Sequence, residues 1–324
     1  MVIRRSAAAI GLAALLALAP DLAFAAQPAI DKAVWVWEAD SAALLQSRAK
    51  ADEVIRFAKA QQVTTLHVYA DRFAGRSLLT SQPAQWRRLL RRLHREGFKV
   101  EALLGSAFLH TEQYVIPARR EIALDMFRRV IQFNAASPAT EEHFDGIHFD
   151  IEPHLLPNWD DERDNLLLAY LELGRAIVDL RHTSGTEIPI APDIPFWLDS
   201  IVLEWEGNTR SVAEHLIRLF DSVTLMDYRN VARGSDGIIA HATLEMDIAE
   251  RAGRRVVVGV ETGDGELAKT SFASLQPVDL ERELALTAAA FQGSPAFGGF
   301  AIHHYGSWKA WLEKSAARAA DTSP

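Results

Sequence analysis

The fold is decided by one stretch in the middle of the chain, Phe144-Asp145-Gly146-Ile147-His148-Phe149-Asp150-Ile151-Glu152-Pro153. Polar and apolar side chains alternate along it, and residues two apart on a strand share a face. His148, Asp150 and Glu152 are therefore expected on one side, with the isoleucines and the phenylalanine between them on the other. Pro153 ends the strand directly after the glutamate.

The three ionisable groups of this strand have two possible roles. Acidic residues at strand ends often cap a following helix or pair with a basic neighbour. Three such groups in strict alternation within an apolar strand are unfavourable to bury without a purpose. The pattern favours a functional site over a structural ion-pair network.

The N-terminal segment has the pattern of a secretory signal. Arg4 and Arg5 precede an apolar run from Ala7 to Ala19, and Ala23-Phe24-Ala25 has the small-x-small form of a cleavage site. We predict a signal peptide over residues 1–25, a mature domain over residues 26–324, and a periplasmic or secreted protein. The apolar run is too short to span a membrane, so we expect no integral membrane anchor.

The composition limits the partners and the cofactors. The chain has no cysteine and a formal net charge of −9, which disfavours nucleic acid as a partner and favours a neutral or cationic substrate. No Gly-rich nucleotide loop follows the first predicted strand, where Glu38-Ala39-Asp40 stands instead. The spacings His-x-His and His-Glu-x-x-His are also absent from the sequence. We therefore expect neither a cofactor nor a catalytic metal.

Strand-like and helix-like segments alternate through the rest of the chain. The predicted strands cover residues 33–37, 64–70, 99–105, 146–152, 187–193, 222–228, 256–261 and 299–305. The predicted helices cover residues 43–60, 86–96, 122–134, 161–181, 211–220, 244–251, 280–291 and 308–317. Eight strand-then-helix units in a chain of this length predict a single-domain α/β fold, a (β/α)8 TIM barrel, in preference to a doubly wound open sheet.

In such a barrel the C-terminal ends of the strands form the floor of the active site. The side chains expected there as substrate ligands are polar or aromatic: Trp37, Tyr69, His148, Asp193, Trp197, Asp227, Arg229 and His304. A tryptophan at these positions either stacks on a sugar ring or only packs in the core. His303 and His304 are adjacent, so we expect only one of them in the pocket.

Two motifs resemble those of family-18 glycoside hydrolases, the chitinase-like barrels. Asp145-Gly146-x-His148-x-Asp150-x-Glu152 resembles the family's Asp-Gly-x-Asp-x-Asp-x-Glu signature on strand four, and Leu225-Met226-Asp227-Tyr228 resembles its Met-x-Tyr motif on strand six. The resemblance implies that Glu152 is the general acid, that Asp150 orients a 2-acetamido group of the substrate as nucleophile, and that Tyr228 hydrogen-bonds that group. The implied activity is hydrolysis of a polysaccharide or oligosaccharide by an exported enzyme.

The chain also departs from this family. His148 stands in place of an Asp, Ile151 where Trp often precedes the Glu, Arg229 where an Asp usually follows the Tyr, and His303-His304 where a Trp commonly lies under the sugar. His148 beside Asp150 is expected to keep that carboxylate ionised, which leaves Glu152 as the more easily protonated partner.

Three alternatives remain open from the sequence. Glu152-Pro153 on strand four and Glu261 on strand seven resemble the acid/base and the nucleophile of retaining glycosidases of the four/seven barrel clan, whose carboxyl groups lie roughly 5–5.5 Å apart. Glu261 instead supports a loop if it only contacts the residues after it. The second alternative is a catalytically silent carbohydrate-binding barrel. The third is another lyase or hydrolase that uses His304 or His148 as a base.

Overall fold

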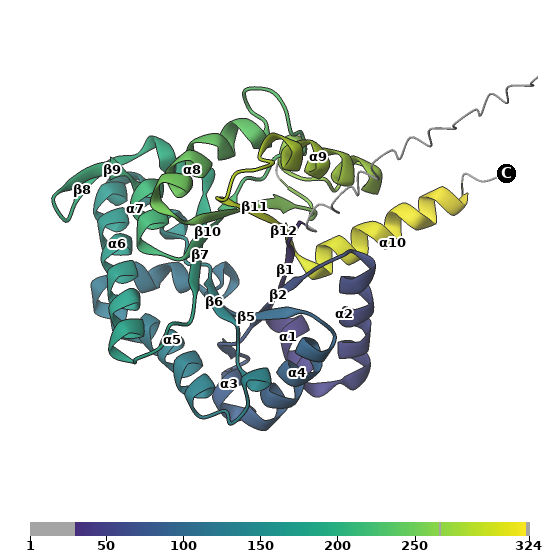
Figure 1. The fold of residues 1–324 in the computed structure, drawn as a ribbon, viewed down its shortest axis with the longest axis horizontal. Coiled ribbons are helices and arrows are strands. Elements are labelled where there is room, and N and C mark those ends of the chain that lie inside the picture. The colour runs from purple at the N-terminus through teal and green to yellow at the C-terminus, as the bar shows by residue number, and fades with distance from the viewer. Residues whose placement is uncertain (1–29, 266, 322–324) are drawn as a thin grey trace, which may run out of the picture.

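The computed structural model describes residues 30–265 and 267–321; the predicted signal peptide lies outside them. Within the described part, eight parallel strands close into a barrel in the order β1-β12-β11-β10-β7-β6-β5-β2 (Figure 1). The strands are β1 (Lys32–Val36), β2 (Thr65–Tyr69), β5 (Lys99–Leu104), β6 (Gly146–Phe149), β7 (Ile190–Pro195), β10 (Ser222–Met226), β11 (Arg255–Glu261) and β12 (Phe297–His303). The predicted TIM barrel is confirmed.

Helices form a ring around these strands (Figure 1). They are α1 (Glu38–Gln46), α2 (Arg48–Ala60), α3 (Leu78–Ser81), α4 (Pro83–Arg95), α5 (Arg120–Ala135), α6 (Trp159–Thr183), α7 (Val212–Leu219), α8 (Ile238–Ala252), α9 (Pro277–Ala290) and α10 (Tyr305–Asp321). None of the described helices combines the length and the apolar character that crossing a membrane requires.

Helix α4 shows why the ring forms. Pro83 occupies its first turn, where the missing N–H has no partner to lose. Trp86, Leu89, Leu90 and Leu93 recur at helical spacing and are all buried, while arginines occupy the opposite face. The helix therefore packs its apolar stripe on the outside of the barrel.

The structure differs from the predicted boundaries in several places that matter for the site, including the ends of β10 at Met226 and β12 at His303 rather than at residues 228 and 305. The helix predicted over residues 43–60 is two helices, because Ser47 leaves helical geometry and its side chain caps α2 by accepting from the Lys50 N–H. Strand β6 ends at Phe149 rather than at Glu152. Asp150 still donates its N–H to the Leu104 carbonyl at 2.8 Å, so its backbone remains hydrogen-bonded to β5 although β6 has ended.

Two hairpins form in segments that the sequence left as loops. One pairs β3 (Arg72–Phe73) with β4 (Arg76–Ser77), and the other pairs β8 (Val202–Trp205) with β9 (Asn208–Ser211). The second hairpin projects outward beside α6 and α7 (Figure 1).

Trp35 divides the interior of the barrel. Its side chain is 1% exposed and lies beside Gly259 on β11, where a Cβ would lie 2.9 Å from the Leu225 carbonyl oxygen and 3.4 Å from the indole ring. Trp35 lines a cavity at the C-terminal ends of the strands, whereas a separate cavity of about 100 Å³ lies toward their N-terminal ends. The cavity at the C-terminal ends of the strands lies where barrel enzymes have their catalytic groups.

Candidate active site

The cavity at the C-terminal ends of the strands has a volume of about 440 Å³. Residues of β1, β7, β10 and β12 line it. The other lining residues belong to the segments that follow β1, β5, β6, β10 and β12. The lining residues are Trp35, Trp37, Glu38, Ser106, Ala107, Phe108, Asp150, Glu152, Asp193, Met226, Tyr228, His303 and His304. The structure thus brings together six predicted site residues in one pocket: Trp37, Asp150, Glu152, Asp193, Tyr228 and His304.

Asp150 and Glu152 occupy different environments in this pocket. Asp150 is 7% exposed, and its Oδ1 forms no hydrogen bond with any described residue. Burial raises the pKa of the Asp150 carboxyl well above its usual value, and the charges of Glu152, Asp193 and Glu38 raise it further. Glu152 is more open, and its Oε2 lies 3.2 Å from His154 Nε2. The expectation that His148 keeps Asp150 ionised is therefore wrong: His148 contacts Asp193 instead, and Asp150 holds its proton more tightly than an ordinary aspartic acid.

Gly105 determines how closely the chain approaches Asp150. It follows β5 with a φ of +83°, a left-handed conformation that favours glycine. A Cβ at this position would lie 2.2 Å from the Asp150 carbonyl oxygen. The absence of a side chain therefore allows the Asp150 backbone to sit directly against the end of β5.

The floor of the pocket is a hydrogen-bonded chain of buried side chains. Trp35 Nε1 donates to Asp193 Oδ2 at 3.1 Å, and Asp193 Oδ1 lies 2.8 Å from His148 Nε2. His148 is 1% exposed and lines the lower cavity rather than the pocket. The expected face of β6 is therefore correct, but His148 lies one layer below Asp150 and connects to the pocket through Asp193.

Glu261 lies beside the pocket and does not line it. Its Oε1 accepts the N–H groups of Thr262 and Gly263 at 2.7 and 2.5 Å, and its Oε2 lies 2.6 Å from His303 Nδ1. Burial opposes ionisation of this carboxyl, but the bonds from His303 and the two amides outweigh it, so its pKa is lowered. Glu261 therefore holds the loop after β11 and the ring of His303.

Both adjacent histidines line the pocket, whereas the sequence predicted only one. The alternation of strand side chains stops at His303, where β12 ends, so it does not place His304. His304 Nδ1 accepts the Gly306 N–H at 3.1 Å, which leaves the proton of the neutral ring on Nε2. Burial, with His303 nearby, lowers the His304 pKa to about 4. His304 is therefore a neutral group and a weak base near pH 7.

Tyr228 lines the pocket as expected from its position after β10. Its ring lies 5.9 Å from that of His303, centroid to centroid. Burial, reinforced by nearby carboxylates with Glu261 foremost, raises the pKa of the Tyr228 phenol well above its usual value. The hydroxyl therefore stays protonated and can donate a hydrogen bond to a ligand.

Two predicted aromatic ligands lie outside the pocket lining. Tyr69 is fully buried in the core, and its hydroxyl donates to the Arg72 carbonyl at 3.1 Å. Trp197 packs edge-on against His154 and Trp159, with ring centroids 5.3 and 5.9 Å away. Trp197 thus supports the histidine that contacts Glu152.

Asp227 and Arg229 also lie outside the lining. Asp227 is fully buried, and its Oδ1 lies 3.0 Å from His241 Nδ1 on α8. Arg229 pairs with Asp236 at 2.8 Å and stacks on Phe196. Tyr228 lies two residues beyond Met226, the last residue of β10, and its side chain lines the pocket. Its neighbours Asp227 and Arg229 instead contact α8 and the loop that contains Asp236.

Phe108 is a pocket residue that the sequence argument missed. It lies on the rim with 77% of its surface exposed, in the short turn after Gly105-Ser106. Ser106 donates its hydroxyl to Glu38, which fixes the start of this turn. An aromatic residue directly after a predicted strand end was the available signal.

Comparisons with known proteins support the fold. The chain matches no family model and no curated protein sequence. Among solved structures it is similar to a chitinase from Rhizomucor miehei, with 13% identity, a TM-score of 0.50, and coverage of 88% of this chain and 98% of the other. It is also similar to the Bacillus cereus spore cortex-lytic enzyme SleL, with 10% identity, a TM-score of 0.50, and coverage of 88% and 74%.

A third similar structure is an exo-β-1,4-mannosidase from Opitutaceae bacterium strain TAV5, with 12% identity and a TM-score of 0.53. The match covers 85% of this chain and 51% of the mannosidase. At these identities the likeness establishes the fold alone. The predicted resemblance to chitinase-like barrels is confirmed at that level.

Proposed function

We propose that the protein is a glycoside hydrolase in which Glu152 is the general acid and Asp150 orients or stabilises the reacting group. One observation carries the proposal. The two carboxyl groups follow β6 at alternate positions and both line the pocket at the C-terminal end of a barrel whose structural neighbours include glycoside hydrolases.

In this mechanism Glu152 donates its proton to the glycosidic oxygen as the bond to the anomeric carbon breaks. Asp150 lies deeper, and because its raised pKa keeps it protonated, it orients the reacting group of the sugar through a hydrogen bond. The Tyr228 hydroxyl holds a polar substituent of the same sugar. Where that substituent is a 2-acetamido group, its oxygen attacks the anomeric carbon as the glycosidic bond breaks, and water then cleaves the new carbon–oxygen bond while its proton returns to Glu152, so no protein nucleophile is required.

The lining of the pocket narrows the substrate class. It has four carboxyl groups, those of Glu38, Asp150, Glu152 and Asp193, and no lysine or arginine is among the described residues that line it. Uronic acids and sulfated sugars would be repelled, because like charges in a partly enclosed site interact strongly. We infer a substrate of neutral sugars or amino sugars.

Two alternative mechanisms have less support. A retaining mechanism with Glu261 as nucleophile requires a free carboxylate oxygen, and both Glu261 oxygens are engaged by His303 and backbone amides. A mechanism with a histidine base requires an accessible ring nitrogen of suitable basicity. His148 is fully buried and does not line the pocket, and burial lowers the pKa of His304 to about 4. We further propose that residues 1–25 direct export, so the substrate is met outside the cytoplasm.

The test is product analysis by mass spectrometry on neutral, amino-sugar and uronic-acid polysaccharides, with Glu152→Gln as the variant. We expect the variant to lose about 10²- to 10⁴-fold in kcat and to keep its glycan affinity. Glu204→Gln is the matched control, because Glu204 is exposed on β8 outside the pocket. Full turnover by Glu152→Gln contradicts the assignment, whereas saturable binding without cleavage by the wild type identifies a carbohydrate-binding barrel.

A further inference from the structure

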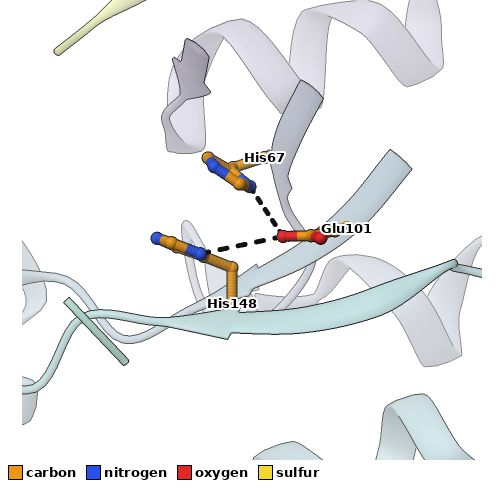
Figure 2. A group of neighbouring side chains, drawn as sticks. All are labelled: His67, Glu101 and His148. Atoms are coloured by element: carbon orange, nitrogen blue, oxygen red, sulfur yellow. Dashed lines mark ion pairs between the residues drawn. The ribbon is translucent and has the colours of Figure 1, made fainter. Parts of the chain in front are cut away.

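Three ionisable side chains meet inside the barrel below the pocket. His67 on β2, Glu101 on β5 and His148 on β6 come from three strands that are neighbours in the barrel (Figure 2). Barrel interiors are ordinarily filled by branched apolar side chains. Buried charged groups are unfavourable unless each has a partner, so this cluster requires an explanation.

His67 has no hydrogen-bond partner among the described residues. Its side chain is 5% exposed, and neither ring nitrogen forms a hydrogen bond. Nδ1 forms an ion-pair contact of 3.0 Å with Glu101 Oε2, without the alignment that a hydrogen bond needs. A buried imidazole with both nitrogens unsatisfied is rare in proteins.

His148 presents its Nδ1 toward the same glutamate. Its Nε2 is held by Asp193 Oδ1 at 2.8 Å, and Asp193 Oδ2 is held in turn by Trp35 Nε1. A carboxylate that accepts from one imidazole nitrogen leaves the other as a lone pair, which is how metal-binding histidines are commonly oriented. His148 Nδ1 lies 3.7 Å from Glu101 Oε2, beyond hydrogen-bond distance. Glu101 Oε2 thus faces one nitrogen of each ring, in ion-pair contacts of 3.0 Å to His67 and 3.7 Å to His148.

The space beside the three residues suits a hydrated ion. All three line the lower cavity of about 100 Å³, which also has Asp31, Lys99 and Arg255 in its wall. Gly146 on β6 leaves room for the glutamate, since a Cβ there would lie 3.2 Å from Glu101 Cγ. A polar cavity of this size has room for water that could complete the coordination shell of an ion.

We propose that His67, Glu101 and His148 bind one divalent transition-metal ion of the Zn²⁺ type. Two imidazoles and one carboxylate, with water in the fourth position, are a common zinc donor set. The nearby Asp193 and Asp31 favour a cation, whereas Lys99 and Arg255 in the cavity wall oppose it. Because the ion holds His148, and His148 holds Asp193, the site stabilises the floor of the pocket from below.

Binding requires one ring to turn. The His67 and His148 rings are stacked, with centroids 3.8 Å apart and planes 17° from parallel (Figure 2). A metal ion lies in the plane of each imidazole that binds it, so two parallel rings cannot both coordinate the same ion. His148 is held by a hydrogen bond to Asp193, whereas His67 has only its ion-pair contact with Glu101 to give up. The His67 ring is therefore the one that rotates.

The test uses the full chain, stripped of metal with a chelator and then titrated with Zn²⁺. We expect one ion per chain by equilibrium dialysis with elemental analysis. At saturation we expect a rise in Tm of about 5 °C or more. Mg²⁺ should give no such rise, because it prefers oxygen ligands. In Zn²⁺-soaked crystals, anomalous scattering at the zinc edge should show a peak between the three side chains.

His67→Gln should lose the Zn²⁺-dependent rise in Tm. His94→Gln, which removes a histidine paired with Asp145 outside the barrel, should keep it. If His67→Gln does not fold, the anomalous map of the wild type decides. The proposal is overturned by peaks at other histidines only, by no peak, or by a full Zn²⁺-dependent rise in His67→Gln. These readouts do not depend on hydrolase activity.

Discussion

Trp37 Nε1 lies 2.9 Å from His303 Nε2, and this contact defines the tautomer of His303. An indole N–H can only donate, so the histidine nitrogen accepts, and the proton of the neutral ring is on Nδ1. That proton is donated to Glu261 Oε2 at 2.6 Å. Side chains from three adjacent parts of the barrel, Trp37, His303 and Glu261, thus form one chain along the pocket wall.

This chain predicts a mild effect of Glu261→Gln. The variant weakens the hold on His303 but removes no reacting group, so we expect kcat to fall by about 10-fold, as for other residues that orient an active group. The measurement is steady-state kinetics on whichever glycan the wild type cleaves. A loss of about 10⁴-fold or more in a folded variant would instead identify Glu261 as the nucleophile.

Phe108 is expected to bind sugar at the rim of the pocket. Its ring is 77% exposed, so Phe108→Ala removes little core packing, but it removes an apolar face on which a sugar ring can stack. We expect KM to rise by about 3- to 10-fold, with kcat and Tm nearly unchanged. Val202→Ala, at an exposed apolar residue on β8, is the control and should leave KM unaltered. An unchanged KM for Phe108→Ala would exclude this contact.

Gly105→Ala should destabilise the protein through the Asp150 carbonyl. Gly75 is a matched control, since its φ of +74° is similar to the +83° of Gly105, but no atom lies within 4 Å of its Cβ position. Gly75→Ala is expected to cost about 1 kcal/mol from backbone strain alone. Gly105→Ala should cost about 1–3 kcal/mol more because of the clash. Urea unfolding measures both, and equal losses would show that the Asp150 backbone moves aside freely.

The buried carboxyl of Glu245 predicts that the free energy of unfolding falls as the pH rises from about 4.5 to about 8. It is fully buried on α8, and neither carboxyl oxygen has a hydrogen-bond partner among the described residues. Burial raises its pKa from 4.5 to about 8. The folded state therefore keeps a proton that the unfolded chain releases near pH 4.5. The free energy of unfolding is unaffected below that pH and falls as the pH rises toward 8.

Glu245→Gln removes this titration, so its Tm relative to the wild type should rise by several degrees between pH 5 and pH 8. Asp247→Asn, at an exposed residue two positions along the same helix, is the control and should show no such trend. Thermal unfolding at a series of pH values measures both. A Tm difference for Glu245→Gln that is the same at pH 5 and pH 8 would contradict the prediction.

The sequence alone determined the barrel and the location of its carboxyl pair. Strand and helix periods are local properties of the chain, so the alternation of eight units could be recognised without the structure. Once a barrel is inferred, residues that follow a strand lie at its C-terminal end. Asp150 and Glu152 could therefore be placed in the pocket, with Trp37, Asp193, Tyr228 and His304.

Only the tertiary structure decided which of the remaining strand-end residues reach the pocket. Tyr69 ends β2, and Asp227 and Arg229 follow β10, but contacts with Arg72, His241 and Asp236 direct their side chains elsewhere. Those partners are set by packing between elements, which sequence periodicity does not record. The same limit applies to His67, Glu101 and His148, because residues on separate strands become neighbours only when the barrel closes.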